Sequence, residues 1–183
     1  EALLLSTLEA LRRARGDDHP ETLSAVRALA RLYRVLGRYD EAEPLYYEFV
    51  ETNRRVSGSD SPHTLSAMNE SALLTYSRGR YDEAESLWLE VLEARRRVLG
   101  NDHVDTGNTL YNLGAVYDKQ GRSEEAGRAW LEVLETHRRL FGDNHPETLN
   151  STRRLANLYK KAGRIDDARP LIARLLAARR AAA

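Results

Sequence analysis

Three histidines stand at the same place in recurring stretches of the sequence and are the first candidates for chemistry. His19, His103 and His145 each follow an Asp or Asn residue. Imidazole binds transition metals, but the ligands must converge on one ion within about 2 Å. Equivalent positions in stacked helices lie about 8–10 Å apart. We therefore expect these histidines to act in turns or helix caps, and we predict no metal site.

Other side chains form no recognisable catalytic constellation. The chain has no cysteine, which excludes disulfides and thiolate chemistry. The glycine-rich phosphate loops, the zinc-protease motif and the hydrolase nucleophile motif are absent from the sequence. Paired carboxylates belong to expected helix starts and exposed helical faces, and His137 stands alone on a helix, where we expect a packing or solvated role. We predict that the chain is not an enzyme and that it needs no cofactor.

Composition narrows the class of partner. In the 183 residues, 28 basic and 28 acidic side chains cancel, so no overall charge draws the chain to nucleic acid or to an anionic membrane surface. No apolar run is long enough to span a bilayer. We expect a cytoplasmic protein without nucleic-acid or membrane partners. The missing initiator Met and the final run of alanines suggest a piece excised from a longer protein.

A period of 42 residues organises the sequence. The stretch G-D-D-H-P-E-T-L begins at Gly16, and related stretches begin at Gly58, Gly100 and Gly142. A second stretch, G-R-Y-D-E-A-E, begins at Gly37, and its relatives begin at Gly79, Gly121 and Gly163. Two interleaved series with one period indicate a repeated structural unit.

The segments between these stretches are predicted to be helices. Apolar residues recur at helical spacing, as at Val26, Leu29, Ala30 and Tyr33. Proline, or Ser61 before it, suits a helix start, and each repeated glycine suits a helix end. We predict an all-α fold of antiparallel helix pairs with nine helices. Its parts are a half-repeat at 1–15 and four repeats at 16–57, 58–99, 100–141 and 142–183, in a single domain over 1–183.

This pattern resembles tetratricopeptide repeats, and in particular the 42-residue type of kinesin light chains and of many bacterial adaptor and regulatory proteins. The third copy carries the resemblance best, with Y-N-L-G-A-V-Y at 111–117 followed by Ala126 and Trp130. Such repeats imply a right-handed superhelical solenoid. The sequence departs from the pattern at Ser71, Thr75, Val104 and Gly107, and Gly107 is expected to weaken the start of its helix by about 1 kcal/mol.

Small and bulky residues alternate where helices should pack. The small positions are Ala30, Ala72, Gly114 and Ala156 on the first helices and Ala42, Ala84, Ala126 and Ala168 on the second. Small side chains allow helices to approach closely. Tyr46, Trp88, Trp130 and Ile172 then supply the bulky partners, and we expect these aromatic residues in the core rather than in a ligand site.

A second stripe beside the core is the candidate binding surface, because the first helices of tetratricopeptide arrays line a concave groove. The stripe holds one acidic residue, Asp118, and seven basic residues in a chain of balanced charge, namely Arg27, Arg31, Arg34, Lys119, Arg153, Lys160 and Lys161. Arginine suits carboxylates, and asparagine can bond a peptide backbone. We predict that the groove binds an extended acidic segment of about six to ten residues. The candidate residues are Ser24, Arg27, Arg31, Arg34, Asn69, Tyr76, Asn108, Tyr111, Asn112, Asn150, Arg153, Asn157, Lys160 and Lys161.

The resemblance implies acidic cargo peptides that often carry tryptophan, as in kinesin light chains. The paired asparagines common in that family are mostly replaced here, for example by Arg27–Ala28 and Arg153–Arg154. Four alternatives stay open. In the first, the stripe is only a solvated helix face, and in the second, the chain is a scaffold that self-associates through apolar terminal helices. In the third, the chain is the sensory or autoinhibitory arm of a larger bacterial multidomain protein, and in the fourth, the stripe binds RNA. Zero net charge, Glu70 and Asp118 disfavour RNA.

Overall fold

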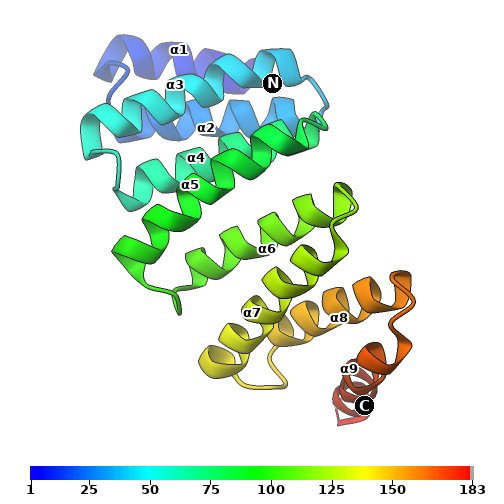
Figure 1. Cartoon of the computed structure of the whole chain (residues 1–183). Coiled ribbons are helices and arrows are strands. Elements are labelled where there is room, and N and C mark those ends of the chain that lie inside the picture. Colours follow the sequence, from blue (N-terminus) through cyan, green and yellow to red (C-terminus); the bar gives the residue numbers. More distant parts are fainter. Residues whose placement is uncertain (182–183) are drawn as a thin grey trace. The chain divides into compact units, whose positions relative to one another are not determined.

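The computed structural model describes residues 1–181, and these contain nine α-helices and no strand (Figure 1). The predicted all-α fold of helix pairs is therefore confirmed. The helices are α1 (Ala2–Arg15), α2 (Pro20–Val35), α3 (Tyr39–Ser57), α4 (Pro62–Ser77), α5 (Tyr81–Leu99), α6 (Val104–Lys119), α7 (Ser123–Phe141), α8 (Pro146–Lys161) and α9 (Ile165–Ala181). Each predicted repeat holds one helix of 16 residues followed by a longer one.

The described chain divides into two compact units. Unit 1 runs from Glu1 to Val98 and holds α1 to α5, and unit 2 begins at Leu99 and holds α6 to α9. Within each unit, consecutive helices pack against one another, as α2 does on α3 and α6 on α7. The single repeat domain over 1–183 stays a prediction.

The repeated histidines cap helices, as predicted. His19 accepts a hydrogen bond through Nδ1 from the main-chain N–H of Glu21 (3.2 Å), and His103 and His145 do the same at the starts of α6 and α8. Ser61 fills this place before α4 and accepts from the N–H of Thr64 (3.1 Å). These bonds satisfy N–H groups that have no partner inside the helix.

The first helix of each pair ends in a left-handed glycine followed by arginine. Gly37, with φ 73°, reverses the chain after α2, a conformation that costs residues with a Cβ atom more than glycine. The guanidinium of Arg38 then lies 4.4 Å from the centre of the Tyr33 ring. The same stacking joins Arg122 to Tyr117 and Arg164 to Tyr159. The second pair has Thr75 at the tyrosine position, which offers Arg80 no ring.

The predicted aromatic core is confirmed in both units. The side chains of Tyr46, Trp88 and Trp130 are each about 1% exposed. Ala42, Ala84, Ala126 and Ala168 on the second helices are fully buried. The aromatic stripe therefore holds the helices of a pair together and is not a ligand site.

Gly114 gives Trp130 room to lie on α6. An ideal Cβ atom at Gly114 would stand 2.3 Å from Nε1 of the Trp130 indole, so no side chain fits without displacing it. The indole Nε1 donates to the main-chain oxygen of Tyr111 (3.0 Å). In unit 1, where Ala72 holds the small position, Trp88 Nε1 donates instead to the side-chain oxygen of Asn69 (2.9 Å).

The departures at Val104 and Gly107 do not displace the start of α6. This helix begins at Val104, in the same register as the helices that begin with proline, and His103 caps it. The expected weakening at Gly107 is thus not visible as a shorter helix. Gly107 is buried, and the nearest side-chain atom to an added Cβ would be Nε2 of His137, at 3.8 Å.

Candidate functional site

Three predicted arginines lie along α2 in unit 1. Because they are spaced by three and four residues, Arg27, Arg31 and Arg34 share one face of the helix. Arg27 is bound to Glu70 of α4, with its Nε 2.7 Å from Oε1. The Glu70 side chain is only 12% exposed, so this carboxylate is held mainly by protein. Arg31 is exposed and Arg34 is half-buried, and neither forms an ion pair within the described residues.

Tyr46 of α3 brings a buried hydroxyl next to this basic face. Burial raises the pKa of the Tyr46 phenol and Glu70 adds to the effect, while the nearby Arg34 and Arg31 guanidinium groups oppose it. Nε of Arg34 and Oε2 of Glu70 are buried atoms without a hydrogen-bond partner. Unit 1 therefore has two arginines without carboxylate partners beside a polar cluster that is not saturated.

The predicted residues of α4 are engaged within the fold. Asn69 accepts the indole hydrogen bond of Trp88 through Oδ1, so this oxygen already has one partner inside the fold. The Tyr76 ring lies 5.4 Å from that of Tyr81 and 5.9 Å from that of Trp88, measured between ring centres. Tyr76 is half-buried, and part of its ring packs inside the pair α4–α5.

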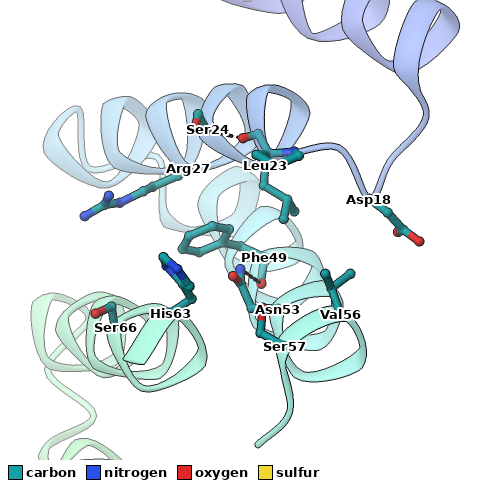
Figure 2. Close-up of a pocket in the computed structure, with 11 residues that line it drawn as sticks. Asp18, Leu23, Ser24, Arg27, Phe49, Asn53, Val56, Ser57, His63 and Ser66 are labelled. Atoms are coloured by element: carbon teal, nitrogen blue, oxygen red, sulfur yellow. Dashed lines mark hydrogen bonds between the residues drawn. The ribbon is translucent and has the colours of Figure 1, made fainter. Parts of the chain in front are cut away.

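A pocket of about 450 Å³ opens between α2, α3 and α4 (Figure 2). Leu23, Phe49 and His63 point toward one another in it, while Asp18 points away at its edge. Asn53 is 6% exposed, and its Nδ2 donates to the main-chain oxygen of Phe49 (2.7 Å). The predicted residues Ser24 and Arg27 also line this pocket, together with Pro20, Val56, Ser57 and Ser66.

The predicted basic and polar residues of unit 2 also have partners. Lys161 Nζ lies 2.8 Å from Oδ1 of Asp118, and Arg153 Nη1 donates to Oδ1 of Asn150 (3.0 Å). The remaining predicted residues differ in exposure. Asn108, Asn157 and Lys160 are exposed, while Tyr111 and Asn112 are half-buried.

Tyr111 is held between two helices. Its ring centre lies 6.3 Å from that of Trp130, and its hydroxyl accepts a hydrogen bond from Nε of Arg154 (3.0 Å). The Arg154 guanidinium also lies over the Tyr111 ring, at 5.4 Å. Arg154, which the stripe omitted, is therefore part of this face of unit 2.

A second pocket, of about 260 Å³, lies between α6, α7 and α8 in unit 2. It is built from the same repeat positions as the pocket of unit 1, because Asn108, His137 and Asn150 occupy the places of Ser24, Asn53 and Ser66. Its other lining residues are Tyr111, Glu147 and Ser151. The repeat thus produces a pocket of one design in each unit, with different chemistry.

The deep residues of both pockets come from the second helices, which the predicted stripe left out. Asn53 and His137 are polar residues in buried positions of α3 and α7, at 6% and 5% exposure. Aligning the repeats shows a polar residue at this place, because Arg95 stands there in α5. A buried polar residue that recurs at one repeat position is a signal that sequence reasoning could have used.

The part of the chain that the structure describes has neither a metal-binding cluster nor a membrane-spanning helix. Among residues 1–181, no group of three or more His, Asp or Glu side chains is placed to hold a metal ion. In the same residues, every helix is too short or too polar to cross a bilayer.

The sequence of the chain matches a known protein family. A sequence profile of the tetratricopeptide repeat family matches residues 1–48, 63–129 and 119–181. The chain belongs to the tetratricopeptide repeat family. The family consists of scaffolds for interaction between proteins, so this tetratricopeptide chain is a protein–protein interaction module. No curated protein sequence matches the chain significantly.

Solved structures share the tetratricopeptide fold. A kinesin light chain-like protein of Podosopora anserina with nearly identical TPR-like repeats is 24% identical, with a TM-score of 0.81 over 97% of this chain and 84% of that one. BtubC (BKLC) of P. vanneervenii is 21% identical, with a TM-score of 0.83 over 98% and 72%. A Rap protein complexed with Competence and Sporulation Factor is 14% identical, with a TM-score of 0.77 over 96% and 46%. This chain thus spans about half the length of the Rap protein.

Proposed function

We propose that this tetratricopeptide chain binds an extended, acidic segment of a partner protein along the faces of its first helices. The observation that carries the proposal is the pair of arginines on α2 without carboxylate partners, Arg31 and Arg34, beside the Arg27–Glu70 ion pair. Three positive charges face one negative charge there. An acidic side chain would offset the excess and could bond the planar guanidinium groups through both carboxylate oxygens.

Arg27 has a different role in this proposal from the one we predicted. Its guanidinium already binds Glu70, so we assign the first contact with a peptide carboxylate to Arg31. The asparagine contacts change as well, because the oxygen of Asn69 is used by Trp88. Among the predicted basic residues of unit 2, Arg153 and Lys160 have no carboxylate partner within the described residues, whereas Lys161 is paired with Asp118.

One solved structure with this fold contains a bound partner. The Rap protein with this fold is complexed with a factor, Competence and Sporulation Factor. At 14% identity the likeness carries the fold alone, so the acidic preference rests on the charges of this chain.

Selection from a random decapeptide library would test the proposal, followed by measurement of the dissociation constant of a selected peptide by fluorescence anisotropy. We expect enrichment of Asp and Glu. We expect Arg31→Glu to weaken binding by about fivefold or more, since one reversed contact in an exposed place is worth about 1 kcal/mol. Binding should also weaken between 50 and 200 mM salt, because salt screens exposed charges.

Arg13→Glu supplies the matched control. Arg13 is exposed on α1 of the same unit and lies outside the stripe, so the net charge changes equally without touching the proposed site. We expect its affinity to equal that of the unaltered chain. Peptides selected without acidic enrichment, or equal losses in the two variants, would show that the proposal is wrong.

A further inference from the structure

The pocket of unit 2 contains a buried side chain with one atom left unused. His137 is 5% exposed, and its Nδ1 lies 3.0 Å from Oγ of Ser151 and 3.3 Å from the main-chain oxygen of Glu147. Nε2 makes no hydrogen bond with the described residues. Because Nε2 is not fully enclosed by protein, it can bond a group that enters the pocket.

The bonds of Nδ1 determine what Nε2 can do. A carbonyl oxygen only accepts hydrogen bonds, so we assign the ring proton to Nδ1, which then donates toward Glu147 and toward the Ser151 hydroxyl. Nε2 of His137 is then an acceptor. A group that enters the pocket can therefore donate a hydrogen bond to Nε2.

Gly107 opens the way to this atom. The equivalent residues of the other repeats are Leu23, Leu65 and Leu149, whereas an added Cβ at Gly107 would have Nε2 of His137 as its only heavy-atom neighbour within 4 Å. A leucine there would project over the imidazole. Glycine at this place therefore leaves space beside Nε2, at a cost in helix propensity of about 1 kcal/mol relative to alanine.

A donor lies in the same pocket. Because Arg153 donates to Oδ1 of Asn150, the amide is oriented with Nδ2 as its free donor. The pocket of about 260 Å³ thus presents an acceptor, His137 Nε2, and a donor, Asn150 Nδ2. A carboxamide has the complementary pair of groups, an N–H₂ donor and a carbonyl acceptor.

Charge disfavours the ionic alternatives. A carboxylate would meet the Glu147 carboxylate and the lone pair of His137, neither of which can donate to it. An ammonium group would offer no acceptor to Nδ2 of Asn150, and the Arg153 guanidinium that bonds Asn150 would repel it. A neutral side chain avoids both conflicts.

We propose that the pocket between α6, α7 and α8 binds an asparagine or glutamine side chain of the partner segment, with His137 Nε2 accepting from its amide and Asn150 donating to its carbonyl. This assignment rests on the proposed function and adds a specificity subsite to it. An acidic segment would thus carry one neutral position, a carboxamide, where it meets unit 2.

The test uses the chain as it exists, with two variants that introduce residues from its own repeats. Gly107→Leu closes the approach to His137, while Val104→Pro restores the proline of the neighbouring repeats one turn earlier, outside the pocket. Random decapeptides are selected on the unaltered chain and on both variants. Thermal unfolding checks the fold, and we expect Gly107→Leu to unfold no earlier than the unaltered chain because leucine is the better helix former.

We expect selection on the unaltered chain and on Val104→Pro to enrich Asn or Gln at one peptide position. Selection on Gly107→Leu should no longer enrich Asn or Gln there, while acidic residues should remain enriched on all three proteins. Changing that Gln to Glu in one selected peptide should weaken binding about tenfold to the unaltered chain and less than twofold to Gly107→Leu. Acidic peptides without a carboxamide preference, or an equal loss on both proteins, would overturn the subsite alone. Selection of no peptide would overturn the proposed function itself.

Discussion

Gly114 shows how a single missing methyl group determines a hydrogen bond in the core. With glycine at this position, Trp130 lies close enough to α6 to bond the main-chain oxygen of Tyr111. With Ala72 in the equivalent place, Trp88 bonds the side chain of Asn69. Because Trp130 bonds a main-chain oxygen, no asparagine is needed at position 111. Tyr111 can therefore stand there and form part of the surface of unit 2.

We predict that Gly114→Ala destabilises the fold, although alanine is the better helix former. The new Cβ would overlap the Trp130 indole, and overpacking of this kind costs about 1–3 kcal/mol. Urea unfolding followed by tryptophan fluorescence measures the change. Gly127→Ala is the control, because its Cβ would meet Leu158 and Tyr159 at ordinary distances of 3.5 Å or more, and it should leave stability unchanged or raise it. Equal stabilisation by both changes would contradict the prediction.

At the scale of elements, arginine–carboxylate pairs recur where the helices begin. Arg38 bonds Glu41, Arg80 bonds Glu83 and Arg122 bonds Glu125, each three residues on. These hydrogen bonds lower the pKa values of Glu41, Glu83 and Glu125. In the same way, Arg55 at the end of α3 lowers the pKa of Asp18 in the loop before α2. The charge runs that mark helix ends in the sequence thus also join neighbouring elements.

The lowered pKa values predict how stability depends on pH. A carboxylate whose pKa is lower in the folded chain stabilises the fold above its unfolded pKa of about 4, and this contribution is lost as the pH falls through the folded value. We expect the midpoint of thermal unfolding, measured by circular dichroism, to be nearly constant from pH 7 to about pH 5 and to fall below about pH 4. Glu41→Gln should have a smaller fall, while Glu135→Gln, at an exposed position of α7 outside these pairs, should behave like the unaltered chain. A midpoint that rises on acidification would contradict this.

At the scale of the whole molecule, the terminal helices carry exposed leucines. Leu3 on α1 is 79% exposed and Leu176 on α9 is 50% exposed, while Leu171, Ile172 and Leu175 are half-buried. Apolar faces of this kind favour association with another surface. The exposed leucines of α1 and α9 therefore support the alternative that the chain is a scaffold that associates with itself.

We predict that residues 1–183 self-associate weakly and that Leu176→Glu suppresses this, because a carboxylate would have to be buried in the contact. Light scattering over a range of concentrations measures the mass. Leu131→Glu, at an exposed leucine of α7, is the matched control and should associate like the unaltered chain. A strictly monomeric mass at high concentration, or equal suppression by both variants, would show that the prediction is wrong.

The amino-acid sequence by itself determined the repeat, the helices, their caps and the aromatic core. These features are local or periodic. A cap joins residues two or three positions apart, as His19 joins Glu21, and the stripe of Tyr46, Trp88 and Trp130 recurs with the 42-residue period. Helical periodicity and hydrogen-bonding chemistry therefore suffice to predict them.

Only the tertiary structure decided which charges remain available and which pockets form. Arg27 meets Glu70, and Lys161 meets Asp118, across two helices that are neighbours only after packing. The floors of the pockets, Asn53 and His137, come from second helices, although the sequence directed attention to the first. Such contacts depend on how each helix is rotated about its axis against the next. Packing of side chains fixes that rotation, and no short-range spacing in the sequence encodes it.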